Sequence, residues 1–172
     1  MTKLSILSLA AVSIVAAATL KFDAPAGWVS KTPTSTMHFA EFALPRIAGD
    51  SEDASVVVYF FGTSGGGGVQ ANVDRWIGQM RQPDGKPSKD LAKTTSLESH
   101  GLKISLVDVS GTFTAEMTPG AGDNVNKPGF RLMAAVVETP GGPYYVKLTG
   151  PQKTVAKWSD SFQTFLKSLR LE

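Results

Sequence analysis

Phe130-Arg131-Leu132-Met133-Ala134-Ala135-Val136-Val137 is apolar at every position but one, and Ser55-Val56-Val57-Val58-Tyr59-Phe60-Phe61 shows the same feature. A strand with one face in water alternates apolar and polar residues, whereas a strand covered on both faces is apolar throughout. We therefore expect both segments near the centre of a β-sheet that is covered on its two sides.

Shorter strand-like segments flank these two. His100-Gly101 predicts a hairpin turn, and residues 139–143, rich in Pro and Gly, predict a second tight connection into a strand over residues 144–148. Residues 37–44 and 20–22 complete the set of expected strands. Most of these strands are joined by hairpins, so the sheet is expected to be mainly antiparallel.

The strand that follows His100-Gly101 changes its apolar phase. Leu102, Ile104 and Leu106 alternate in the even positions, and Val107 and Val109 then occupy the odd positions. Because side chains alternate between the two faces of a strand, a change of phase predicts a β-bulge or a bend at this point.

Two amphipathic helices are predicted. One covers about residues 69–81 and is stopped by Gln82-Pro83-Asp84-Gly85, and the other runs from Pro151 to about Leu169. The expected order is β-β-β-α-β-β-β-β-α. The predicted fold is α+β, with a mainly antiparallel sheet of about six or seven strands packed against two helices.

The start of the chain has the features of an export signal. Residues 4–15 form an apolar run after Lys3, and Ala16-Ala17-Ala18 follow. The run is shorter than the roughly 20 residues that span a bilayer, and its flanks suit signal-peptidase cleavage. We expect a signal peptide over residues 1–18, a single domain over 19–172, no stable membrane insertion after cleavage, and a final location in the periplasm or outside a bacterial cell.

Composition excludes several function classes. The 172 residues include no cysteine, which excludes lipid attachment, thiol chemistry and thiolate zinc sites. The 17 basic and 15 acidic residues are interspersed, with a formal net charge of +2. A nucleic-acid-binding domain usually shows a basic stripe, so we expect no nucleic-acid partner.

Gly62-Thr63-Ser64-Gly65-Gly66 formally matches G-x-S-x-G between a strand and a helix, which is the setting of a hydrolase nucleophile. Gly65 to Gly68 separate Ser64 from the helix, and His100 is the only histidine downstream. We therefore assign no catalytic residue and keep a small serine hydrolase centred on Ser64 as the alternative. The same glycines could bind a phosphate or carboxylate through their N–H groups, but we interpret them as a flexible strand-to-helix connection, since glycine tolerates a positive φ.

No metal or cofactor site is predicted. His38 and His100 are far apart in the sequence, and the loop around Asp123 and Asn124 lacks the closing Glu of a calcium loop. The acidic residues Asp50, Glu52 and Asp53 are interpreted as a solvated turn.

The opening phrase Phe22-Asp23-Ala24-Pro25-Ala26-Gly27-Trp28 and the closing stretch Val146-Lys147-Leu148-Thr149-Gly150-Pro151, which leads into the final helix, carry a family resemblance. Together with the order of the elements, they resemble the PsbP-like fold family along the whole chain after residue 18. Members include accessory subunits of photosystem II and bacterial envelope proteins. The resemblance implies this fold and a function in docking on partners.

Two long connections, residues 82–92 and 115–129, are the expected contact surface, since loops of such length are usually functional or disordered. The first hypothesis is an exported, non-enzymatic domain that binds an envelope protein or a small ligand through these loops and the glycine segment. A purely structural, self-associating envelope component is a third possibility. The candidate interaction residues are Gly66, Gly67, Gly68, Lys86, Lys89, Met117, Asp123, Asn124, Asn126 and Lys127.

Overall fold

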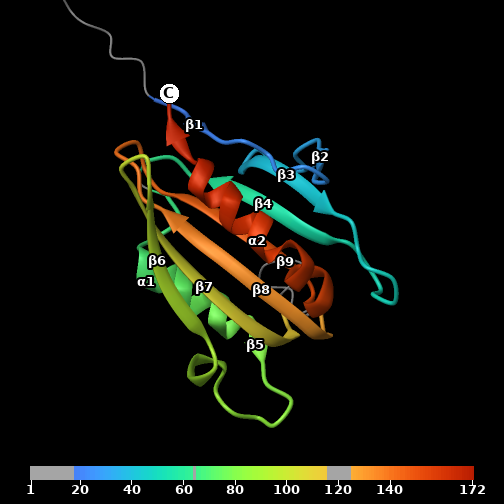
Figure 1. Cartoon of the computed structure of the whole chain (residues 1–172). Coiled ribbons are helices and arrows are strands. Elements are labelled where there is room, and N and C mark those ends of the chain that lie inside the picture. The colour runs from blue at the N-terminus through green and yellow to red at the C-terminus, as the bar shows by residue number, and fades with distance from the viewer. Residues whose placement is uncertain (1–17, 64, 116–124) are drawn as a thin grey trace, which may run out of the picture.

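A computed structural model of the chain describes residues 18–63, 65–115 and 125–172. Figure 1 shows a twisted sheet with one helix in front of it and a shorter helix behind it. The elements in chain order are β1 (Leu20–Lys21), β2 (Val29–Lys31), β3 (His38–Leu44), β4 (Ala54–Phe60), α1 (Val69–Gly78), β5 (Met80–Arg81), the 3₁₀-helix η1 (Ser88–Asp90), β6 (Lys93–Ser99), β7 (Leu102–Phe113), β8 (Lys127–Val137), β9 (Tyr144–Pro151), α2 (Gln152–Ser168) and β10 (Arg170–Leu171).

The main sheet has eight strands in the order β2-β3-β4-β9-β8-β7-β5, and β6 also pairs with β7. Every pairing is antiparallel, and β1 pairs with β10 apart from this sheet. The predicted α+β fold is therefore confirmed. The two segments expected near the centre become β4 and β8, and they flank β9 on either side.

The sheet buries a separate apolar core on each face. The longer helix α2 covers one core, which includes Val56, Val146 and Leu148, together with its own Phe162 and Phe165. The shorter helix α1 covers the other core through Val73, Trp76 and Ile77. Since α1 has only 10 residues and packs on β7 and β8, the same face of β4 and β9 stays partly open.

The expected bulge after Leu106 is wrong. Leu106 pairs with Ala135 and Val107 pairs with Ala134 in an unbroken register, and the register shifts only between Gly111 and Phe113. The apolar phase changes because the first half of β7 faces the core under α2 and the second half faces the core under α1. Leu102, Ile104 and Leu106 belong to the core under α2, whereas Val107 and Val109 belong to the core under α1.

Two further boundaries differ from the prediction, and three short strands are additional to it. The first helix ends at Gly78, and Met80–Arg81 forms β5, which pairs with β7 and buries Met80. β8 begins at Lys127, so this residue lies in a strand and not in the expected loop over 115–129. The short strands β2 and β10 were not expected. The turn at His100-Gly101 is confirmed, with φ angles of 49° and 79°.

In the parts of the chain that the structure describes, no helix combines the length and the apolar character needed to cross a membrane.

Candidate functional site

The most unusual residue of the sheet is Lys147, in the middle of β9. Its neighbours in register are Val57 on β4 and Ala134 on β8, so it lies between the two segments that are apolar at almost every position, 55–61 and 130–137. Val146 and Leu148 face the core under α2. Because strand side chains alternate, Lys147 points to the other face, next to the part that α1 leaves open.

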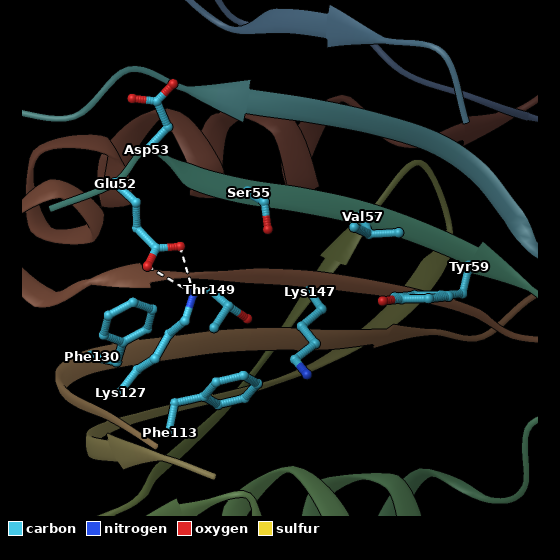
Figure 2. Close-up of a pocket in the computed structure, with 10 residues that line it drawn as sticks. All are labelled: Glu52, Asp53, Ser55, Val57, Tyr59, Phe113, Lys127, Phe130, Lys147 and Thr149. Atoms are coloured by element: carbon cyan, nitrogen blue, oxygen red, sulfur yellow. Dashed lines mark hydrogen bonds and ion pairs between the residues drawn. The ribbon is translucent and has the colours of Figure 1, made fainter. Parts of the chain in front are cut away.

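Lys147 lines a hollow of about 220 Å³ on that face (Figure 2). A second hollow of about 180 Å³ shares Tyr59 and Lys147 with the first and extends to α1. We call the two together the Lys147 cleft. Its lining residues are Glu52, Asp53, Ser55, Val57, Tyr59, Phe61, Arg75, Trp76, Gln79, Phe113, Lys127, Phe130, Tyr145, Lys147 and Thr149.

The ammonium group of Lys147 has few partners. Nζ donates a hydrogen bond to Oε1 of Gln79 at 2.8 Å and lies 4.9 Å from the centroid of the Phe113 ring. Burial and the nearby Arg75 lower the pKa of Lys147 from 10.5 to about 8. Among the described residues, no carboxylate forms an ion pair with it. Lys147 is partly buried at the wall of an open cleft. A charge that is partly removed from water is favoured by a partner of opposite sign, and among the described residues Lys147 has none.

The acidic residues near the cleft are already engaged. Both carboxylate oxygens of Glu52 accept from Nζ of Lys127 at 2.7 Å, and this pair closes one end of the cleft. Asp53 accepts from the backbone N–H of Arg46 at 3.0 Å, and Figure 2 shows its carboxylate pointing away from the other lining residues. Neither acid offsets the charge of Lys147.

A polar group borders the cleft at Tyr59. The ring of His38 lies edge-on to Tyr59, with centroids 4.8 Å apart, and its Nδ1 is bonded to the carboxylate of Glu41. Glu41 also accepts hydrogen bonds from the N–H and the hydroxyl of Thr34. These bonds lower the pKa of Glu41, and the bond from the N–H has the largest effect. Burial and the charge of Glu41 raise the pKa of Tyr59, so its phenol stays protonated and can donate a hydrogen bond.

The predicted interaction residues do not form one surface. Gly66, Gly67 and Gly68 precede α1 beside the β8–β9 turn. Lys86 and Lys89 follow β5, and Asn126 and Lys127 lie at the start of β8. Both pairs are therefore at the end of the sheet opposite to the glycines. Of the ten candidates only Lys127 lines the Lys147 cleft, and Met117, Asp123 and Asn124 lie outside the described residues.

The glycine segment is held by the protein itself. Nδ2 of Asn72 donates to the carbonyl oxygens of Gly66 and Gly68 at 2.6 and 3.0 Å, and the hydroxyl of Tyr145 donates to that of Gly67 at 2.8 Å. Asn72 is buried, so Gly66, Gly67 and Gly68 are held in a defined conformation before α1. This supports its interpretation as a connection.

Ser64, the centre of the alternative hydrolase hypothesis, lies outside the described residues. His100 lies in the β6–β7 turn, where its Nδ1 is 3.2 Å from the carbonyl oxygen of Leu169. β9, β8 and β7 separate β6 from β4, which leads to Ser64. At about 4.8 Å per strand the distance is roughly 19 Å, so the sheet does not bring His100 to the end of β4.

The acidic turn has a structural role that the sequence interpretation missed. Oδ2 of Asp50 accepts from both the N–H and the hydroxyl of Thr154, at 3.0 and 2.6 Å, in the first turn of α2. Glu52 pairs with Lys127, and Asp53 binds the backbone of its own loop. The interpretation as a merely solvated turn is therefore wrong. No group of three or more His, Asp or Glu side chains suited to a metal is found among the described residues.

Lys147 itself was missed as a site residue. The available signal was one lysine inside the strand Tyr144-Tyr145-Val146-Lys147-Leu148, with apolar residues on both sides. A charged residue within a strand can face water or a cleft. Only the pairing of β9 between β4 and β8 distinguishes the two.

No family model matches the sequence, and no curated protein matches it with significance. The structure is similar to LpqN of Mycobacterium tuberculosis, described as involved in cell envelope biogenesis, with a TM-score of 0.51, 10% identity, and coverage of 90% of this chain and 83% of that one. It is also similar to PA94 of Pseudomonas aeruginosa, a protein of unknown function (TM-score 0.48, 15% identity, 76% and 80% coverage).

A third similar structure is cyanobacterial PsbP (CyanoP) of Synechocystis sp. PCC 6803, with a TM-score of 0.48, 14% identity, and coverage of 95% of this chain and 99% of that one. The similarity to proteins of the PsbP-like fold that the sequence predicted is thus found. At these identities it concerns the fold alone.

Proposed function

We propose that the chain is an exported, non-enzymatic binding domain of the cell envelope that holds a small organic ligand in the Lys147 cleft. The observation that carries the proposal is a lysine in the middle of the sheet that faces a cleft and has no acidic partner among residues 18–63, 65–115 and 125–172. LpqN, a protein involved in cell envelope biogenesis, has a similar fold, which is in keeping with an envelope function.

Binding fits the surroundings of Lys147 better than catalysis does. A lysine nucleophile reacts as the neutral amine, whereas the hydrogen bond to Gln79 and the Phe113 ring both favour the ammonium form. With a pKa of about 8 the side chain is mainly charged at neutral pH. A charged lysine in a cleft with aromatic walls is suited to holding a ligand.

A fragment screen by NMR tests the binding proposal. The purified chain is titrated with a set of neutral, cationic and anionic small molecules, and the backbone amide shifts are followed. We expect the largest shifts at Val57, Tyr59, Phe113 and Lys147, with smaller shifts in a Val57→Trp variant whose indole fills the cleft. If no fragment shifts these residues, the proposal is wrong.

Export has its own test. Mass spectrometry of the protein from the native cell is expected to show an N-terminus at Thr19 in the periplasmic or extracellular fraction. A chain that retains residues 1–18 in the cytoplasm would contradict export and leave the binding site unaffected.

Docking on an envelope protein is a second candidate function, which one observation favours. Leu91 is 56% exposed and follows Lys86 and Lys89 in the β5–β6 connection, which extends beyond the end of the sheet in Figure 1. Cross-linking in the native cell tests it: a partner captured by the wild type is expected to be lost with Leu91→Ser and kept with Lys153→Gln, a change on α2. Equal capture by both variants excludes docking through this connection.

A further inference from the structure

We infer that the ligand of the Lys147 cleft is a small carboxylate with an aromatic or branched apolar body, whose anionic group binds Lys147 and whose body packs on Phe113 and Phe130. This inference rests on the proposed function and adds the chemical class of the ligand. It follows from the charges, the free donors and the walls of the cleft.

The charge of the cleft favours an anion. Glu52 and Lys127 neutralise each other, and the carboxylate of Asp53 points away. Arg75 of α1, on the wall opposite β4, adds a second positive charge, and its guanidinium donates to Oδ1 of Asn72 rather than to an acid. A ligand with a negative charge would therefore supply what the described residues lack.

Glu41 does not change this balance. Its carboxylate lies near Tyr59, outside the residues that line the cleft, and three donors from Thr34 and His38 already satisfy it. Burial raises the pKa of Tyr59, and the charge of Glu41 adds to this effect, so the phenol stays protonated. The phenol can then donate to a ligand.

The donors left in the cleft match a carboxylate. An ammonium group has three N–H donors, and one of those of Lys147 is used by Gln79. The other two meet no acceptor in the part of the chain that the structure describes, and they are able to bind the oxygens of a ligand. The hydroxyl groups of Tyr59, Ser55 and Thr149 line the same space, and they are able to donate to a carboxylate oxygen or accept from a ligand hydroxyl.

The walls favour an apolar body of modest size. Phe113 and Phe130 stack on each other with ring centroids 6.3 Å apart, and Val57 lies across the hollow on β4. The 220 Å³ hollow is equivalent to about seven waters of liquid volume, which is room for one ring and a carboxylate. Inorganic phosphate would use the charge and leave these walls uncovered.

The test compares matched probes on the purified chain at pH 7. Benzoate and cyclohexanecarboxylate are titrated against benzamide and cyclohexanecarboxamide, their uncharged analogues, and against inorganic phosphate, with amide shifts at the cleft as the readout. We expect each carboxylate to bind at least about tenfold more tightly than its amide, because charge-assisted hydrogen bonds are the stronger ones. Phosphate is expected to bind more weakly than benzoate.

Variants locate the effect. Lys147→Gln is expected to remove the preference for benzoate over benzamide, Lys147→Arg to keep most of it, and Lys153→Gln, an exposed lysine on α2, to leave it unchanged. The amide spectrum of each variant shows whether it folds. If Lys147→Gln does not fold, the pH dependence in the wild type decides instead.

In the wild type, benzoate affinity is expected to fall about tenfold between pH 7 and pH 9, because the pKa of Lys147 is about 8 and the neutral amine lacks the charge. Tyr59, whose pKa is raised, stays protonated across this range and does not contribute to the change. Equal binding of acids and amides would overturn the inference and leave the binding function in place. If neither the acids nor the amides change the shifts of the cleft residues, both the inference and the proposed binding function are overturned.

Discussion

On the sheet face that α1 leaves open, the residue with the largest effect on charge and stability is Lys147. A valine or isoleucine at this position would continue the apolar surface of β4 and β8. The lysine instead places a charge where burial opposes it, as the lowered pKa indicates. A residue that costs stability in this way is typical of a binding site.

That cost is measurable as a pH-dependent stability. The folded pKa of Lys147 is about 8 and the ordinary value is 10.5, so the unfolded chain binds more protons between these values and folding becomes more favourable as the pH rises. We expect Lys147→Met to be more stable than the wild type at pH 7, by about 2 kcal/mol, and this difference to shrink towards zero near pH 10.5.

Urea unfolding of both proteins from pH 7 to pH 10.5 measures the difference. The other titrating groups are common to the two chains, so their contributions cancel in the difference between the two free energies of unfolding. A difference that does not vary with pH would show that Lys147 is not penalised by burial.

Gly66 is the second residue with a specific prediction. Its φ is +85°, and a Cβ atom there would lie 2.4 Å from the ring of Tyr145. We expect Gly66→Ala to lower the free energy of unfolding by about 2 kcal/mol or more, from backbone strain and from displacement of Tyr145. The control is Gly78→Ala in the last position of α1, where the space is open.

Gly78→Ala is expected to be neutral or slightly stabilising, by up to about 0.5 kcal/mol, since alanine is the better helix former. Thermal unfolding of both variants gives the comparison. Equal effects at the two positions would mean that the glycine segment has no defined structure.

At the scale of elements, α2 depends on a residue from a distant loop. Its first residue follows Pro151, which offers no side-chain cap. Asp50 of the β3–β4 loop supplies the acceptor for the N–H of Thr154 and bonds to its hydroxyl. A carboxylate at this end of the helix also suits the helix dipole. These bonds join the β3–β4 loop to the start of α2.

Replacing Asp50 by alanine is expected to cost about 1–2 kcal/mol, the usual range for the loss of a helix cap. Asp53→Ala is the matched control, because Asp53 lies in the same loop and is exposed, with a single bond to a backbone N–H. It is expected to cost less than about 0.5 kcal/mol. Similar losses for both variants, measured by urea unfolding, would argue against capping by Asp50.

Some elements could be predicted from the sequence because their signal is local. The apolar runs of β4 and β8 indicate strands that are covered on both faces whatever their partners are. The predicted end of α1 was wrong, because Met80 fits both the helical period and a buried position in a strand. Only the pairing of Met80 with Phe113 shows that it belongs to a strand. The phase change after Leu106 was real, but its cause lies in the helices on either side of β7.

For the molecule as a whole, the candidate site is formed by parts that are distant in the sequence. Val57, Lys127 and Lys147 come from three strands that are adjacent in the order β4-β9-β8, although α1, β5, η1, β6 and β7 separate β4 from β8 along the chain. Sequence patterns favoured loops as the site, because loop composition is visible locally. The cleft arises instead because α1 is too short to cover the whole face of the sheet.

The pKa of Lys147, measured with and without benzoate, tests the central claim most directly. The ¹³Cε and ¹Hε shifts of this side chain are followed against pH in the purified chain. We predict a pKa of about 8 without ligand and a higher value with benzoate, because a bound carboxylate favours the ammonium form. A value near the ordinary 10.5 that benzoate does not change would contradict the assignment of this cleft as an anion-binding site.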